Sequence, residues 1–87
     1  MIILDGLAMT DKQRAHRYVK LQLGFPEYYG ENLDALWDIL SAVSKPTHIV
    51  LINPEELTAN LGEYADLFIA VFLEAAEANK ALKFEIL

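Results

Sequence analysis

Short apolar runs rich in β-branched residues predict three strands, at residues 1–5, 48–52 and 82–87. Their sequences are MIILD, HIVLI and LKFEIL, and this length and composition are typical of buried strands. Gly6 ends the first run, as a turn residue should. The residues that we expect in or near the core of the sheet are Ile2, Leu4, Val50, Ile52, Phe84 and Ile86.

Between the first two strands the apolar residues change to helical spacing, which predicts a helix over residues 11–23. Thr10 and Gln13 have the spacing of a capping box at its start. Gly24 is suited to the left-handed conformation that ends many helices. The predicted inward stripe consists of Ala15, Val19 and Leu23.

A second helix is predicted over residues 33–43, after a loop around Pro26. Asn32 precedes it and is a favourable N-cap residue. Asp34 and Asp38 lie four residues apart on its outer face, where like charges repel each other by roughly 0.2–0.5 kcal/mol. The residues expected to face inward, at least in part, are Leu33, Leu36, Trp37 and Leu40.

Two more helices are predicted between the second and third strands, over residues 54–62 and 64–78. Asn53, Pro54 and Glu56 combine a cap residue, a proline at the first helical position and an acidic residue at the third. The last helix has an apolar stripe of Leu67, Phe68, Val71, Phe72 and Ala75.

The predicted order is therefore strand, two helices, strand, two helices, strand. Helical connections between short apolar strands require a parallel sheet, because a parallel pair cannot be joined by a tight turn. We predict an α/β fold, with a three-stranded parallel sheet and four helices, formed by residues 1–87 as a single domain.

Composition narrows the classes of function. The 87 residues carry a net charge of −6 and include no cysteine, which excludes disulfides and thiolate metal sites and fits the reducing cytoplasm. The N-terminus reaches Asp5 without a basic leader, and no apolar run is long enough to span a membrane. The acidic balance argues against nucleic acid as a direct partner, because phosphate binding requires a basic surface.

Asp34 and Asp38 form the strongest candidate for chemistry, since a glycosidase or a metal site could use paired carboxylates. Both are expected on one exposed helix face, however, and no nearby sequence suggests a cleft that would raise a pKa. His16 and His48 lack the spacing of metal ligands or of a nucleophile-activating pair, and no phosphate loop or nucleophile elbow is present. We therefore expect no enzyme activity, no metal and no cofactor, and keep a small carboxylate-dependent hydrolase as a remote alternative.

The carboxylates of residues 26–38 fit a binding surface better. Asp34 can interact with the helix dipole, but Asp38 lies in mid-helix and gains nothing from it. Glu27 and Glu31 add to the same field, and no Lys or Arg occurs between Lys20 and Lys45. This pattern predicts a focused acidic patch that would suit a basic, phosphate-handling protein.

Aromatic residues accompany these charges. We expect one of Tyr28 and Tyr29 to pack inward and the other to face solvent, with Trp37 half buried. Exposed aromatic rings beside concentrated charge are typical of protein interfaces.

The stretch PEYYGENLDALWD, residues 26–38, closely resembles the signature of the barstar family, intracellular inhibitors of the secreted ribonuclease barnase. A weaker likeness covers the rest of the chain, including the helix with His16 and the segment VFLEA at 71–75. The fold that the resemblance implies is the one predicted above, a parallel three-stranded sheet with helices packed on it.

The resemblance implies a stoichiometric inhibitor, a monomer when free, that plugs the active site of a basic, extracellular-type ribonuclease similar to barnase. Asp38 would be the main phosphate mimic, Asp34 a second charged contact, and Tyr28 the ring that covers a catalytic histidine. The remaining contacts that it implies are Asn32, Trp37, Ala42, Val43 and Glu74.

One departure concerns Ala42-Val43, which stand where the best-known family member has a glycine–tryptophan pair. The apolar contact implied at these positions is therefore smaller here. An alternative interpretation is an acidic binding module that keeps the scaffold and sequesters another basic protein.

Overall fold

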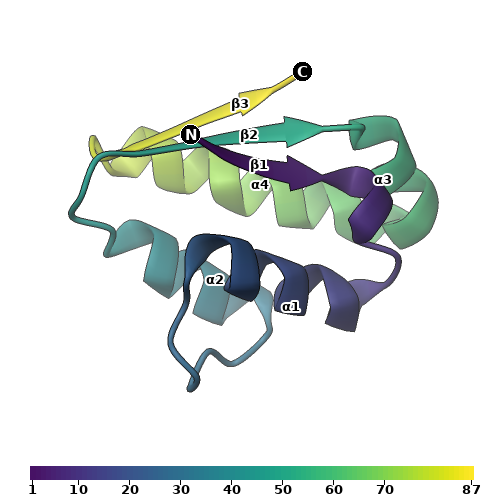
Figure 1. Ribbon diagram of the computed structural model, residues 1–87, viewed down its shortest axis with the longest axis horizontal. Coiled ribbons are helices and arrows are strands. Elements are labelled where there is room, and N and C mark those ends of the chain that lie inside the picture. Colours follow the sequence, from purple (N-terminus) through teal and green to yellow (C-terminus); the bar gives the residue numbers. More distant parts are fainter.

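The computed structural model describes all 87 residues and contains one parallel sheet of three strands in the order β1-β2-β3 (Figure 1). The prediction of an α/β fold with a parallel three-stranded sheet and four helices is confirmed. A short 3-10 helix, η1 (Gly6–Ala8), follows the first strand. The other elements are β1 (Ile2–Asp5), α1 (Lys12–Leu23), α2 (Leu33–Ser41), β2 (Thr47–Ile52), α3 (Pro54–Leu61), α4 (Glu63–Ala78) and β3 (Leu82–Ile86).

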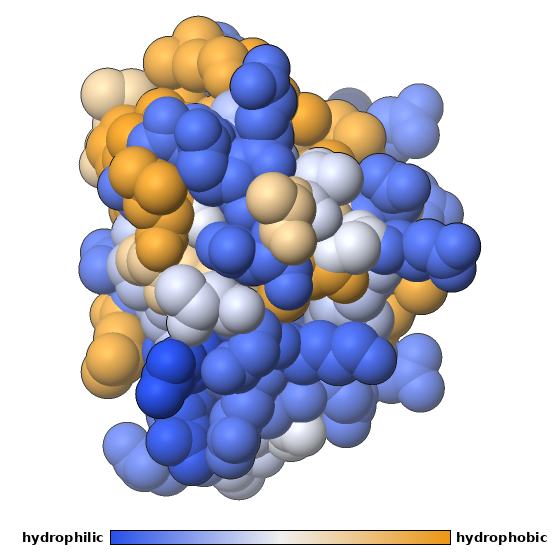
Figure 2. Space-filling view, turned by 90° about the vertical axis from the view of Figure 1, so that its right-hand side faces the viewer, coloured by the Kyte–Doolittle hydropathy of each residue, from blue (hydrophilic) through white to orange (hydrophobic).

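Helices α1, α2 and α4 lie on one side of the sheet, and α3 lies near the carboxyl ends of β1 and β2 (Figure 1). α4 packs against both β3 and α2, so that α2 lies one layer away from the strands. Seen from the end where α3 lies, apolar residues gather at the top and along one side, hydrophilic residues lie between them, and hydrophilic residues cover most of the lower part (Figure 2). The arrangement leaves the outer face of α2 free of contacts with the sheet.

The core forms between the sheet and these helices. Of the predicted sheet residues, Leu4 and Val50 are buried, while Ile2, Ile52 and Phe84 are partly buried. Ile86 is exposed, and that prediction was wrong, because Ile86 is the last residue of an edge strand. The largest fully buried side chains include Phe68, Phe72, Leu36, Leu40 and Ile49.

The predicted stripe of α4 needs one correction. Phe68, Phe72 and Ala75 are buried and Val71 is partly buried, as predicted. Leu67 is exposed, because the buried line follows the spacing i, i+4, i+7 from Phe68 and Leu67 lies about 100° away from it around the helix.

Local capping chemistry predicted some helix ends correctly. Gly24 ends α1 with φ of 68°, and the Asn32 side chain accepts a hydrogen bond from the amide of Ala35. The cap of α1 is Asp11 rather than Thr10, since the carboxylate of Asp11 accepts from the amide of Arg14 at 2.8 Å. Aspartate and threonine are both good caps, and the charged acceptor holds this position.

The start of α3 differs from the prediction in a similar way. Pro54 occupies the first helical position, as predicted, but the side chain of Asn53 makes no capping bond. Its amide instead donates to the carboxylate of Asp5 at 2.8 Å, which joins the ends of β1 and β2. This bond is the largest cause of the lowered pKa of Asp5, and the amide of Leu7 adds to it.

No helix of the structure is both long and apolar enough to cross a membrane.

Candidate protein-binding site

Helix α2 presents two different faces. Leu36 and Leu40 are fully buried in the core, where α2 packs against α4. Asp34 and Asp38 are exposed on the other side, as predicted, and neither forms an ion pair. The fold therefore leaves both carboxylates available to another molecule.

Asparagine side chains hold both ends of α2. At the start, Asn32 accepts from the amide of Ala35 at 2.8 Å and donates to the carbonyl of Gly30 at 3.2 Å. At the end, the amide of Asn79 donates to the carbonyls of Leu40, Ser41 and Val43, at 3.0, 3.3 and 2.9 Å. Carbonyls in the last turn of a helix have few partners within it, and that of Leu40 also accepts from the amide of Val43 at 3.4 Å, so Asn79 adds hydrogen bonds to the last turn of α2 and to the residue just beyond it. Local sequence around α2 gives no sign of this bond.

The aromatic residues divide as predicted. Tyr28 has 86% of its surface exposed, whereas its neighbour Tyr29 is only 5% exposed. Trp37 is 39% exposed on the first turns of α2, so part of its ring is buried and part faces solvent. Tyr28 and Trp37 therefore place two aromatic rings at the surface of the segment that carries Asp34 and Asp38.

A buried histidine holds the loop before α2. His16, on α1, is 1% exposed, and its two ring nitrogens lie 2.6 Å from the hydroxyl of Tyr29 and 2.7 Å from that of Tyr64. A neutral imidazole has one donor and one acceptor nitrogen, so one tyrosine donates to it and the other accepts. Burial lowers the pKa of His16 and raises the pKa of Tyr29 and Tyr64, which favours the neutral form of all three.

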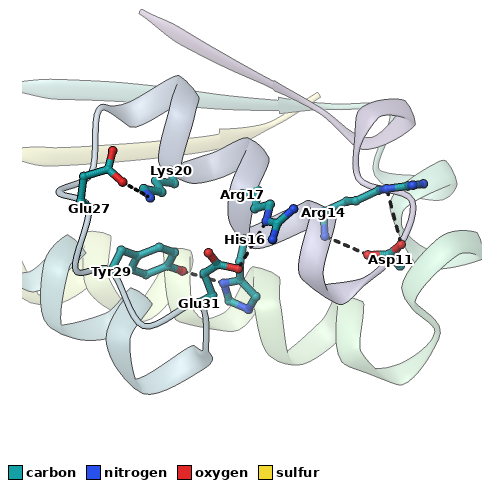
Figure 3. Close-up of polar contacts among 8 residues, drawn as sticks. All are labelled: Asp11, Arg14, His16, Arg17, Lys20, Glu27, Tyr29 and Glu31. Atoms are coloured by element: carbon teal, nitrogen blue, oxygen red, sulfur yellow. Dashed lines mark hydrogen bonds and ion pairs between the residues drawn. The ribbon is translucent and has the colours of Figure 1, made fainter.

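The contact between His16 and Tyr29 fixes the position of the tyrosine next to Tyr28 (Figure 3). Phe25 adds an edge contact to the ring of Tyr29, with the ring centroids 4.9 Å apart. The sequence predicted that His16 is structural, but not that it joins the loop to α4 through Tyr64.

The acidic patch is narrower than the sequence predicts. Helix α1 supplies two cations to the loop: Lys20 pairs with Glu27 at 3.2 Å and Arg17 pairs with Glu31 at 3.8 Å (Figure 3). The prediction counted Glu27 and Glu31 with the field of α2 and overlooked that Lys20 and Arg17, which lie 7 and 14 residues earlier in the chain, are close to them in space. The unpaired charge of this segment is concentrated on Asp34 and Asp38.

The other predicted contacts lie around α2. Glu74 is exposed on α4, the helix against which α2 packs. Ala42 is exposed and Val43 is partly buried, just after the last turn of α2. The eight predicted residues thus come from three neighbouring parts of the fold: the loop, α2 with the residues after it, and α4.

A groove that the sequence did not predict adjoins these residues. It has a volume of about 420 Å³ and lies between the α1–α2 loop and the connection from α2 to β2. Its lining consists of Leu23, Gly24, Phe25, Pro26, Tyr28, Ile39, Ala42, Val43, Ser44, Lys45 and Thr47.

The chemistry of this surface is that of recognition. Exposed carboxylates accept hydrogen bonds from guanidinium, ammonium and imidazolium groups, and such charged bonds are about twice as strong as neutral ones. No histidine lies among the site residues, and no group of three or more His, Cys, Asp or Glu side chains is placed to hold a metal ion.

Fold and surface together define a small α/β protein with unpaired carboxylates and aromatic rings on the outer face of one helix. The chain belongs to the barstar family: the family model described as "Barstar (barnase inhibitor)" matches residues 1–87. It is also similar to a protein of Bacillus subtilis (strain 168) that is named "Putative ribonuclease inhibitor YrdF". The two are 45% identical over 80 residues, which cover 91% of this chain and 88% of that protein.

Proposed function

We propose that this protein is a stoichiometric inhibitor of a barnase-like ribonuclease and has no catalytic activity of its own. Its family and the printed name of its Bacillus subtilis relative support this function. The structural observation that carries the proposal is the pair of exposed, unpaired carboxylates Asp34 and Asp38, beside the exposed ring of Tyr28.

Physical chemistry explains how this face would act. A ribonuclease binds RNA phosphates with cationic side chains, and a carboxylate at the same place offers them a similar negative charge. In this proposal Asp38 takes the place of the main phosphate and Asp34 that of a second one. Tyr28 covers the catalytic histidine, Trp37 and Asn32 lie beside these contacts, and Glu74 adds a charge at the rim.

The uncompensated negative charge that makes Asp34 and Asp38 repel each other also attracts a basic enzyme in this proposal. The fold supplies no cation to either side chain, so the field of α2 is available to steer a basic enzyme toward it. The inhibitor acts as a monomer in the cytoplasm, without metal or cofactor, and contacts the enzyme rather than RNA.

The test is a titration of purified barnase-like ribonucleases with the full chain, using a fluorogenic RNA substrate. We expect cleavage to stop at a 1:1 ratio and inhibition to be unaffected by EDTA. The association rate should fall as salt rises, because screening shortens the reach of the charges to about 10 Å at 0.1 M.

Other outcomes of this titration would favour other functions. A complex that forms while cleavage continues would indicate a module that sequesters a basic protein without blocking an active site. Hydrolysis by the isolated chain, lost in a chain with both Asp34 and Asp38 replaced by Asn, would indicate a carboxylate-dependent hydrolase and overturn the proposal.

A further inference from the structure

The groove beside α2 is a second recognition feature next to the carboxylates. Its walls carry apolar side chains, Leu23 and Phe25 at and just after the end of α1 and Ile39 and Val43 in and just after α2. A volume of about 420 Å³ exceeds what a single large side chain needs, so a protruding apolar side chain can enter with its neighbours.

The groove is continuous with the proposed interface. Tyr28, Ala42 and Val43 line it and are also among the residues proposed to contact the enzyme. Ala42 follows Asp38 by four residues, and residues at this spacing are neighbours on a helix surface, about 5–6 Å apart at Cβ. An enzyme that engages Asp38 therefore extends over the entrance of the groove.

Hydrogen bonds hold both walls. The carbonyl of Val43 accepts from the amide of Asn79 at 2.9 Å. On the other wall, the amide of Phe25 donates to the carbonyl of Lys20 at 2.9 Å, and the amide of Tyr29 to the carbonyl of Pro26 at 3.0 Å. The groove is thus a fixed feature of the surface.

The charge of the groove is opposite to that of α2. Lys45 lines it and is the only Lys or Arg between Lys20 and Lys80. Lys45 is exposed and forms no ion pair. A partner that is basic opposite Asp34 and Asp38 gains from being acidic opposite Lys45.

We propose that the groove receives an apolar side chain of the ribonuclease and that Lys45 pairs with a carboxylate of the same enzyme beside it. This inference rests on the proposed function and extends it. Asp34 and Asp38 bind the cationic side chains with which ribonucleases of this kind hold phosphates, and which these enzymes share. The groove and Lys45 select one enzyme among them.

The test uses a barnase-like ribonuclease that the wild-type chain inhibits, together with three variants of the full chain. Ser44→Trp, at an exposed position of the lining whose side chain makes no hydrogen bond, fills the groove, and Lys45→Glu reverses its charge. Lys12→Glu makes the same change in net charge at the first residue of α1, about 16 Å from the end that borders the groove. Melting temperatures verify that each variant is folded.

The two lysine variants should affect the inhibition constant differently. Lys12→Glu makes the inhibitor more acidic and should leave the inhibition constant unchanged or lower it slightly, through steering of a basic enzyme. Lys45→Glu should raise it at least tenfold, because a carboxylate then faces a carboxylate. Ser44→Trp should also raise it at least tenfold, because loss of one buried apolar side chain weakens binding by about this factor or more.

The inference is overturned if Lys45→Glu behaves like Lys12→Glu, or if folded Ser44→Trp inhibits as well as the wild type. Should Ser44→Trp fail to fold, Lys45→Glu decides alone, since the side chain of Lys45 is exposed. If Asp38→Ala loses inhibition while both groove variants inhibit normally, the proposed role of the groove and Lys45 is overturned and the proposed function stands. A wild-type chain that inhibits no such ribonuclease would overturn both.

Discussion

The loop of residues 24–32 and helix α2 each carry two carboxylates, and the fold treats the two pairs differently. In the loop, Glu27 and Glu31 pair with Lys20 and Arg17 of α1. On α2, Asp34 and Asp38 have no cation partner, although they repel each other at a spacing of four residues. The carboxylates of the loop each have a cation partner within the molecule, and those of the helix have none.

The same contrast separates the neighbouring tyrosines. Tyr29 is buried and bonded to His16, whereas Tyr28 is almost fully exposed. Residues of one short segment therefore divide into those that build the fold and those that the fold only presents. This division can be tested by comparing stability and inhibition in matched variants.

The largest effect is expected for Asp38→Ala compared with Glu27→Ala. Asp38→Ala should weaken inhibition by about 2–5 kcal/mol or more, a range measured partly on barnase–barstar itself, because it leaves desolvated cations of the enzyme unpaired. The free protein should become more stable by a few tenths of a kcal/mol, since repulsion is removed and alanine favours helix. Inhibition constants and melting temperatures of the same preparations measure both quantities.

Glu27→Ala is the control for this comparison, because it also removes one exposed carboxylate from the segment. The pair with Lys20 is a surface ion pair, worth about 0–1 kcal/mol, and inhibition should change little. Lower stability of Asp38→Ala together with unchanged inhibition would mean that Asp38 serves the fold.

A smaller effect is expected for the two tyrosines. Tyr29→Phe removes the hydroxyl that bonds to His16 and leaves a buried ring nitrogen unsatisfied, which should lower the free energy of unfolding by about 1–3 kcal/mol. Tyr28→Ala changes an exposed residue and should alter stability by less than about 0.5 kcal/mol while weakening inhibition. Urea unfolding measures the stability of both variants, and enzyme titration measures their inhibition. If Tyr28→Ala proved less stable than Tyr29→Phe, the division between the two tyrosines would be contradicted.

The smallest effect is a dependence of stability on pH that arises from His16. Burial lowers its pKa below the ordinary value of 6.5, and the nearby charge of Glu31 opposes this shift less strongly. Below pH 6.5 the unfolded chain therefore binds a proton that the folded chain does not. Stability should be full above this pH and fall as the pH decreases toward the lowered pKa, by at most about 1.4 kcal/mol per pH unit.

His16→Gln provides the comparison, because every other titrating group is shared with the wild type and cancels in the difference. Urea unfolding between pH 8 and pH 5 should give a smaller slope for the variant than for the wild type. Equal slopes would mean that His16 is not the group responsible.

Features that depend on local chemistry were predictable from the sequence. The hydrophobic pattern located the three strands and the four α-helices but not the short 3-10 helix η1, and the helical connections implied a parallel sheet. Gly24 and Asn32 were recognised as helix ends because the residue type alone specifies their conformation or cap bond. The opposite faces of α2 followed from the period of the helix, with Asp34 and Asp38 outside.

Features that join distant parts of the chain were not predictable. The bond from Asn53 to Asp5, the pairs that α1 makes with the loop, and the contact from His16 to Tyr64 each depend on the folded arrangement. The groove could not be predicted for the same reason, since one wall lies at the end of α1 and in the loop after it, and the other lies in α2 and in the connection from α2 to β2. A sequence pattern shows which residues are available, but not which ones meet.

The bonds of Asn79 have a consequence for the thermodynamics of association. Its amide joins α4 to three carbonyls at and just after the end of α2, while Asn32 fixes the start of the same helix. The conformational entropy of this segment is therefore lost when the protein folds, and little remains to be lost on binding. An enzyme would meet a segment whose backbone is already ordered, so the backbone part of the entropic penalty of binding should be small, while the loss of translational and rotational freedom and the ordering of exposed side chains such as Tyr28 remain to be offset.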